Sequence, residues 1–212
     1  MPCELPPKAL LAAATGADLL VIGARGVGGF RGLLLGSVSQ ACLHHTTETL
    51  AVVRDPGSGG GGADTRDAQL GVPGGRIVVG IDDSEAAKRA LRWALDEARR
   101  RKASVDVVHA WRPPYLGARP FGPSGMDVDA IEARARADFD RVVDREVTGQ
   151  QPGPVERIVV RGGAARAILD ASAGADLVVL GSRGRGGFEG LLLGSVSHHV
   201  AHHVPCPLVV VR

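Results

Sequence analysis

The residues with the clearest chemical potential are glycines and serines in one run near the end of the chain. The run reads GSRGRGGFEGLLLGSVS over residues 181–197. Glycines at 181 and 184 let a backbone turn sharply and approach a ligand closely. We expect Gly194 and Ser195 near the start of a helix, whose free N–H groups and positive dipole end favour an anion. The pattern indicates a phosphate-binding loop, although a tight loop that only packs has a similar composition.

The spacing of this run excludes two common phosphate motifs. No Gly-Lys-Ser or Gly-Lys-Thr follows, so the run is not a P-loop. The glycines follow the fourth expected strand and not the first, so they are not the dinucleotide fingerprint.

No nucleophile is paired with a base. The histidines at 198, 199, 202 and 203 have helical spacing but no carboxylate or thiol at motif spacing. We interpret them as a helix face near a subunit contact and not as a metal site.

The elements that must position this run alternate between strands and helices. Ser84 is a suitable cap for a helix continuing to residue 101. Strands are expected at 76–81, 104–110, 155–160, 176–180 and 208–211, and further helices at 127–147, 164–173 and 191–203. This alternation predicts a parallel sheet with helices on its faces. Ligands bind beyond the carboxyl ends of such strands, where Asp82 and the glycine run fall.

An unequal internal repeat divides the chain. Residues 17–54 align with residues 175–212 without a gap, and 24 of the 38 positions are identical. The period is too long for a solenoid. Only the second copy is preceded by the front half of a domain. We therefore expect a truncated C-terminal half-domain at 1–54, a Gly-rich linker at 55–75 and a complete domain at 76–212.

The composition argues against other classes of protein. Among the 212 residues, aromatic residues make up 3% and the net charge is +2, whereas a nucleic-acid binder is expected to show a strong basic excess. The longest apolar runs reach about six residues, far short of the ~20 that cross a bilayer. The three cysteines have no metal-ligand spacing, and no secretory leader opens the chain. We expect a cytoplasmic protein with reduced thiols that binds neither nucleic acid nor membranes.

Taken together, the motifs resemble those of the universal stress protein family. Its nucleotide signature is G-x-x-G, nine residues, then G-S, and here nine residues separate Gly184 from Gly194. The sequences VVGIDDSE at 78–85 and PCPLVVV at 205–211 are similar to the family as well. The resemblance implies a Rossmann-like α/β fold: an open parallel five-stranded sheet, in the order 3-2-1-4-5, with helices on both faces. A partial second copy would accompany it.

The resemblance also implies an ATP site, because the ATP-binding branch of the family carries this glycine motif. Asp82 would meet the ribose or a phosphate-bound Mg²⁺. Gly80 and Ile81 would line the same edge, and Ala110 would contact adenine through its backbone. The ribose and the phosphates would be held by Gly181, Arg183, Gly184, Gly194, Ser195, Val196 and Ser197.

Two functions follow as expectations. The first is an ATP-binding protein of stress response or signalling, whose nucleotide changes its conformation or its partners. The second is a nucleotide-independent interaction or dimerisation module with a vestigial site. Because no catalytic residues are found, we expect at most slow ATP hydrolysis assisted by Mg²⁺. An enzyme of the wider adenine-nucleotide α-hydrolase lineage would need additional catalytic groups.

The partial copy retains the phosphate-side residues but has no counterpart of Asp82 or Ala110. In the family's strand order its first strand would lose a neighbour and leave an open edge. Family members often pair through their last strands. We therefore expect residues 50–54 to dock beside residues 208–212, within one chain or between the chains of a homo-oligomer. The rival interpretation is that residues 1–54 are the remnant of a longer tandem protein. The retained residues are Gly23, Gly26, Gly36, Ser37 and Ser39.

Overall fold

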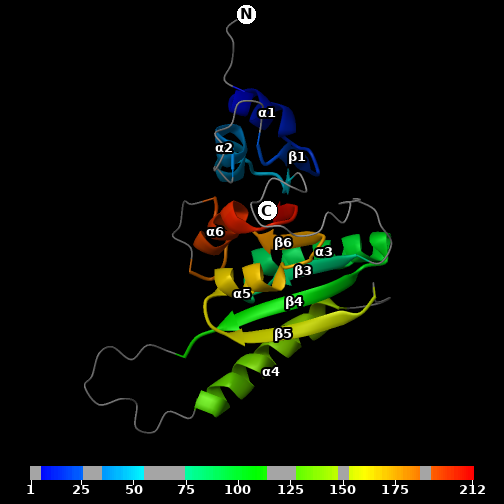
Figure 1. The fold of residues 1–212 in the computed structure, drawn as a ribbon, viewed down its shortest axis with the longest axis vertical. Helices are drawn as coiled ribbons and strands as arrows, with labels where there is room; N and C mark the ends of the chain where they lie inside the picture. The colour runs from blue at the N-terminus through cyan, green and yellow to red at the C-terminus, as the bar shows by residue number, and fades with distance from the viewer. Residues whose placement is uncertain (1–5, 26–34, 55–74, 114–127, 148–152, 187–191) are drawn as a thin grey trace, which may run out of the picture.

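One mixed sheet of seven strands joins both copies of the repeat (Figure 1). The computed structural model describes residues 6–25, 35–54, 75–113, 128–147, 153–186 and 192–212. The strand order is β1-β2-β7-β6-β3-β4-β5. Within the complete domain this gives the expected order 3-2-1-4-5, with all four pairings parallel. The sheet is larger than the expected five strands because the partial copy extends it.

The strands and helices alternate along the chain. The strands are β1 Leu20–Gly23, β2 Leu50–Val53, β3 Arg76–Gly80, β4 Ser104–Trp111, β5 Val155–Arg161, β6 Leu177–Gly181 and β7 Leu208–Val211. The helices are α1 Pro6–Ala14, α2 Ser37–His45, α3 Glu85–Arg101, α4 Val128–Glu146, α5 Ala164–Ala171 and α6 Ser195–His203.

The sheet separates two apolar cores because successive strand residues point to opposite faces. In β3, Ile77 and Val79 pack with α3 and α4, whereas Val78 packs with α5 and α6. Helix α3 begins as expected, with the Ser84 hydroxyl accepting the N–H of Ala87 at 3.2 Å. Its buried stripe is the expected one, namely Ala87, Ala90, Leu91, Ala94, Leu95 and Ala98.

Some expected boundaries differ from those observed. Helix α6 begins at Ser195 and not at residue 191. The extended backbone of Gly194 (ψ 160°) and the hydrogen bond from its N–H to the Ser182 carbonyl (2.7 Å) place the residue outside the helix. Residues 55–74 of the expected linker lie outside the described residues, as does Gly26. No helix in the described ranges is both long and apolar enough to span a bilayer.

The two copies share their local geometry. Gly36 and Gly194 have nearly the same extended conformation, and each precedes a helix without a side-chain cap. The Ser39 hydroxyl donates to the Gly23 carbonyl at 2.7 Å, and the Ser197 hydroxyl donates to the Gly181 carbonyl at the same distance. The repeat in the sequence is therefore a repeat in three dimensions.

The copies meet where β2 pairs antiparallel with β7. Ala51 lies opposite Val209, which is its own counterpart in the repeat, so the junction has the geometry of an isologous, two-fold contact. The expected docking of residues 50–54 beside 208–212 is confirmed as a pairing within one chain. Leu50 and Leu208 are almost fully buried in the shared core.

Polar groups at the junction repeat the two-fold pattern. Arg212 donates to the Leu43 carbonyl at 2.6 Å, and its counterpart Arg54 donates to the carbonyl of Ala201, the counterpart of Leu43. The ring centroids of His44 on α2 and His198 on α6 lie 5.2 Å apart. Of the four histidines expected near a subunit contact, His198 thus lies at the contact between the two copies within one chain.

Strand β1 lies at the outer edge of the sheet, as expected for a copy without its front half. It pairs with β2 alone among the described strands, and Val21 is 56% exposed.

We predict that the two copies unfold as one unit. Leu50→Ala should lower the free energy of unfolding by about 2–5 kcal/mol, because it removes a buried side chain at the junction. The measurement is denaturant unfolding followed by the fluorescence of Trp93 and Trp111, which both lie in the complete domain. Val21→Ala on the exposed edge is the control and should change stability by less than about 0.5 kcal/mol. An unchanged tryptophan transition in Leu50→Ala would show independent unfolding.

We also predict that acid weakens the junction. Burial lowers the pKa of His44, with further lowering by His198, His45 and Arg212. Burial likewise lowers the pKa of His202, together with His198, His203, Arg54 and His44.

Because both imidazoles are held neutral in the fold, the unfolded chain binds more protons as pH falls below about 6.5, and stability should fall there. Urea unfolding between pH 8 and pH 5 measures this slope. The variant His44→Gln/His202→Gln should have a shallower slope, and equal slopes would contradict the prediction.

Candidate functional site

The candidate site lies where the strand order of the complete domain reverses. Strand β3 pairs with both β4 and β6, and the chain leaves β3 toward β4 but leaves β6 toward β7. The loops after β3 and β6 therefore diverge at their carboxyl ends, which is where ligands bind in open α/β sheets. Asp82 follows β3, and the glycine run follows β6, as the sequence predicts.

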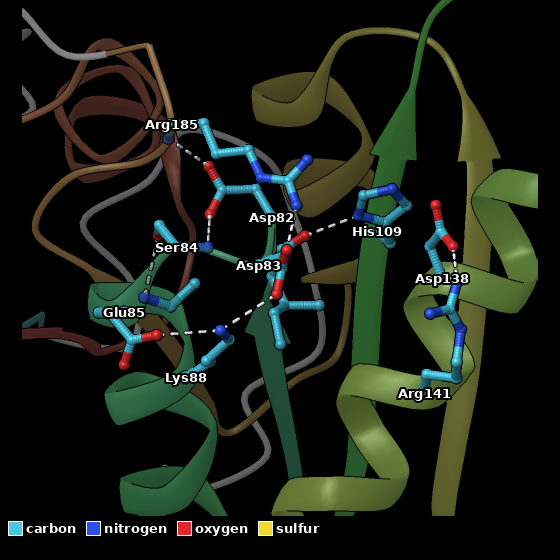
Figure 2. A network of polar contacts seen from close by, with 11 residues as sticks. Asp82, Asp83, Ser84, Glu85, Lys88, His109, Asp138, Arg141 and Arg185 are labelled. Atoms are coloured by element: carbon cyan, nitrogen blue, oxygen red, sulfur yellow. Dashed lines mark hydrogen bonds and ion pairs between the residues drawn. The ribbon is translucent and has the colours of Figure 1, made fainter.

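Asp82 fastens the two loops together (Figure 2). One carboxylate oxygen accepts the N–H of Ser84 at 3.2 Å, and the other accepts the N–H of Arg185 at 2.9 Å. The Ser84 hydroxyl adds a second link by donating to the Arg183 carbonyl at 3.2 Å. Asp82 thus anchors the loop after β6, while Ser84 caps α3. The link from Ser84 to Arg183 is one that the sequence did not predict.

The Asp82 carboxylate leaves no space for a side chain at Gly184. A Cβ at Gly184 would lie 2.2 Å from an oxygen of the Asp82 carboxylate, a distance that no real contact allows. Gly181 is required for packing, since a Cβ there would lie 2.6 Å from the backbone of Ala86 in α3. A Cβ at Gly80 would lie closer than 3 Å to the methyl ends of Ile168 and Leu180, which are flexible side-chain ends that could shift. These glycines hold the strand ends and the loop together whether or not a ligand is bound.

The start of α6 presents backbone donors. The N–H groups of Ser195, Val196 and Ser197 belong to the first turn and have no intrahelical acceptor, and no side chain caps the helix. Ser195 is exposed. The Ser197 hydroxyl is buried and donates to the Gly181 carbonyl, so only its backbone N–H is available to an anion.

A cavity of about 410 Å³ opens beside this helix start. It is lined by Gly194, Ser195 and His198 of the complete domain and by His44 and His45 of the partial copy, together with Leu192 and Leu193. The partial copy therefore contributes to the wall of the site. The sequence analysis did not place residues of α2 in the site, because α2 and α6 are brought together by the β2–β7 pairing.

The expected adenine side lies at the ends of β3 and β4. Ile81 extends the pairing of the two strands, with its N–H donating to the Val108 carbonyl at 2.9 Å. Ala110 lies two residues farther along β4, opposite Val160 of β5. The His109 ring nitrogen Nδ1 lies 2.9 Å from the Ile81 carbonyl. Residues 114–127, which follow β4, lie outside the described residues. So do residues 187–191 of the glycine run.

The two arginines of the glycine run, Arg183 and Arg185, differ in their surroundings. Arg185 forms an ion pair with Asp83 (Figure 2), whereas Arg183 is exposed and takes part in no ion pair between described residues. Asp83 also pairs with Lys88 at 3.1 Å. The Lys88 hydrogen bond lowers the pKa of Asp83, and Arg185 lowers it further. Asp83 therefore stays ionised and holds the Arg185 side chain over the start of α3.

The donor set gives no support to the expected Mg²⁺. Within the described parts of the chain, no three His, Cys, Asp or Glu side chains lie close enough together to hold a metal ion. Both oxygens of Asp82 already accept backbone N–H groups.

The sequence matches the model of the universal stress protein family over residues 6–54 and 75–212. The chain belongs to this family. A universal stress protein of Mycobacterium tuberculosis is 34% identical over 201 residues, which are 92% of this chain and 62% of the relative. One of Mycolicibacterium smegmatis is 35% identical over 212 residues, covering 99% of this chain and 66% of the relative. This universal stress protein thus spans less than two thirds of the length of the first of these relatives.

Solved structures of the family have the same fold. A universal stress protein of Archaeoglobus fulgidus is 24% identical with a TM-score of 0.64, covering 98% of this chain and 66% of that one. A protein of Pseudomonas aeruginosa described as a putative universal stress protein has a TM-score of 0.65 at 17% identity, covering 98% and 68%.

We predict that Gly184→Ala destabilises this universal stress protein through Asp82. The new methyl group displaces the carboxylate from the Arg185 N–H, and losing a hydrogen bond to a charged group costs about 1.5–3 kcal/mol. Gly186→Ala is the matched control, because a Cβ there meets nothing within 4 Å.

Denaturant unfolding measures both variants. In an Asp82→Ala background, Gly184→Ala should cost less, giving a coupling energy in the double-mutant cycle. Equal losses of unfolding free energy in the two backgrounds would show that Gly184→Ala does not act through Asp82.

Proposed function

We propose that this universal stress protein binds ATP at the edge between β3 and β6. The triphosphate lies against the first turn of α6, and the adenosine lies toward Ile81 and Ala110. The observation that carries the proposal is the uncapped start of α6, with its three backbone donors, directly after the glycine loop. A helix start with free N–H groups and a positive dipole end favours a negatively charged ligand.

The remaining proposed residues shape the site. Asp82 holds Arg185 by its backbone N–H, so the start of the loop after β6 is tied to the end of β3 before a ligand arrives. Gly80, Gly181 and Gly184 keep the strand ends and the loop close to the site. When bound, ATP supplies a polyanion that neutralises the donors of α6. The residues proposed to contact it are Ile81, Asp82, Ala110, Arg183, Gly194, Ser195, Val196 and Ser197.

The role in the cell follows from this site. In our proposal the protein acts in the stress response by changing conformation or partners when ATP binds, in the cytoplasm and with hydrolysis at most slow. The β2–β7 junction uses the last strands of both copies within one chain. A homo-oligomer must therefore use another surface, such as the edge of β1.

The second candidate function is a nucleotide-independent interaction module. It is favoured by the internal use of the site's polar groups: Asp82 and the Ser197 hydroxyl are both engaged within the fold. Such a protein keeps the glycine motif for packing alone. It would not bind ATP at millimolar concentrations.

Substitution of Ser195 by proline tests the site. Proline at the first helical position removes one N–H and keeps the helix, and Gly194 before it is already extended, as proline requires. We expect Ser195→Pro to weaken ATP binding at least about tenfold, from the loss of one hydrogen bond to a charged group, as measured by isothermal titration calorimetry. A bulky residue at Gly184 is less informative, because it meets Asp82 first.

Ser37→Pro is the matched control. It makes the same change at the first residue of α2, which also follows an extended glycine. We expect normal ATP affinity and normal thermal stability. If Ser195→Pro and the wild type bind ATP equally, the phosphates do not lie at α6; if the wild type does not bind ATP, the interaction module is the better interpretation.

A further inference from the structure

The outer edge of the partial copy is a surface that the complete copy keeps covered. The repeat assigns each residue of β1 a counterpart in β6. Val21 is 56% exposed, whereas its counterpart Val179 is 0% exposed. Leu19 is 39% exposed, and its counterpart Leu177 only 3%. The residue types are the same in both copies, so the difference lies in what packs against them.

The backbone of β1 also presents hydrogen-bonding groups at this edge. The Leu20 N–H donates to the Thr49 carbonyl at 2.9 Å, so the even-numbered residues of β1 face β2. Because alternate residues of a strand direct their N–H and C=O groups to opposite sides, those of Val21 face outward. In the complete copy, β3 lies on this side of β6 and pairs parallel with it. None of the described strands takes that place beside β1.

Helix α1 extends beyond the edge of β1. In the complete copy, α5 packs beside α6 and lies over β3 and β4, where Ile168 is only 4% exposed. Helix α1 is the counterpart of α5 and packs beside α2 in the same way (Figure 1). Leu10, the counterpart of Ile168, is 36% exposed. The apolar side of α1 thus overhangs a strand position that no described strand fills.

The opposite face of β1 is open as well. In the complete copy, α3 crosses the end of β6 so closely that a Cβ at Gly181 would lie 2.6 Å from the backbone of Ala86. Its counterpart Gly23 is exposed. Among described atoms, a Cβ at Gly23 would meet the nearby Arg25 carbonyl oxygen alone, at 3.3 Å. The described part of the partial copy therefore lacks both the strand beside β6 and the helix over it.

We infer that the edge of β1 is a docking site for a strand–helix segment of another polypeptide. Its strand lies parallel to β1 and beneath α1, adding to the sheet by main-chain hydrogen bonds, and its helix covers Val21 and Gly23. The complete copy defines the chemistry of this segment. Strand β3 is apolar on both faces, and α3 turns a side of alanine and leucine to the sheet. A small residue suits the position below Leu10, as Gly80 lies close to Ile168.

The same edge is open to a second copy of the chain, but a two-fold pairing of two β1 strands suits it less well. In such a pair, each α1 would come over the β1 of the other copy. That strand is already covered by α2, through the packing of Ile22 and the bond from the Ser39 hydroxyl to the Gly23 carbonyl. A segment that brings its helix on the opposite face avoids this overlap.

The probe for the test is a synthetic peptide of residues 76–101, which carries the sequences of β3 and α3. The peptide is labelled at its N-terminus and titrated with the full chain, and fluorescence anisotropy measures binding. The wild type should bind it, and a scrambled peptide of the same composition should bind at least tenfold more weakly. Because Ile81 directs its N–H to β4, that of Val78 faces β6 in the fold. The peptide with Val78→Pro should therefore also bind at least tenfold more weakly.

Two variants of the protein locate the site. Val21→Pro removes the outward N–H of β1 without removing a bond to β2, a change that edge strands tolerate, and it should weaken the probe at least tenfold. Val159→Pro is the matched control on β5, the opposite edge of the sheet. The Gly162 N–H donates to the Trp111 carbonyl of β4, so the Val159 N–H also faces outward. Val159→Pro should bind the probe like the wild type.

The inference is overturned if the wild type does not bind the probe at submillimolar concentration, or if the scrambled peptide binds equally well. It is equally overturned if both proline variants lose the same affinity. Thermal unfolding shows whether each variant is folded, and the Val78→Pro peptide tests the same pairing without changing the protein.

Size-exclusion chromatography without the peptide tests the other occupant. A dimer that Val21→Pro converts to a monomer assigns the edge to a second copy and overturns the inference, whereas a state that Val21→Pro leaves unchanged supports it. Docking at β1 is independent of the ATP site proposed above. Ser195→Pro should therefore bind the peptide like the wild type, even if ATP binding is lost.

Discussion

The antiparallel pairing of β2 with β7 is the contact on which the partial copy depends. About 50 residues bury too little surface to be stable alone, and here they instead extend a sheet that already has a core. The register places Ala51 opposite its own repeat counterpart Val209, so each copy offers the other the same surface, as subunits do in a two-fold dimer. Leu50 and Leu208 are almost fully buried at this junction, and burial of apolar side chains stabilises it. The hydrogen bonds of Arg54 and Arg212 across it are partly buried.

The candidate site is built from interactions that the fold itself requires. Asp82, Ser84 and Gly184 hold the glycine loop to the start of α3, and Ser197 holds the start of α6 to the end of β6. Asp82 and the Ser197 hydroxyl are therefore committed internally. The groups left for a ligand are the backbone N–H groups of α6 and exposed side chains such as Arg183. A binding site of this kind needs little reorganisation when an anion arrives, because its donors are fixed by the helix. Because the fold itself requires these glycines and contacts, a glycine motif alone does not distinguish a working site from one kept only for packing.

Local patterns in the sequence predicted the elements well, and long-range contacts less so. The alternation of Ile77, Val78 and Val79 and the stripe of α3 follow from the periods of strands and helices, and both are confirmed. The strand order came from the family resemblance. The start of α6 at Ser195 was missed because the leucines at 191–193 continue a helical pattern that Gly194 ends.

The loop after β6 reaches two layers of the fold. Its last residues lie beside α6 and the partial copy, and Arg185 near its start lies close to α4. Gly194 is bonded to Ser182 and Arg185 to Asp82, so the ends of one short segment are fixed to different layers of the fold. Gly184 has no Cβ, and this leaves the Asp82 carboxylate the space to accept the Arg185 N–H. The absence of one side chain thus permits the contact that ties this segment to the end of β3.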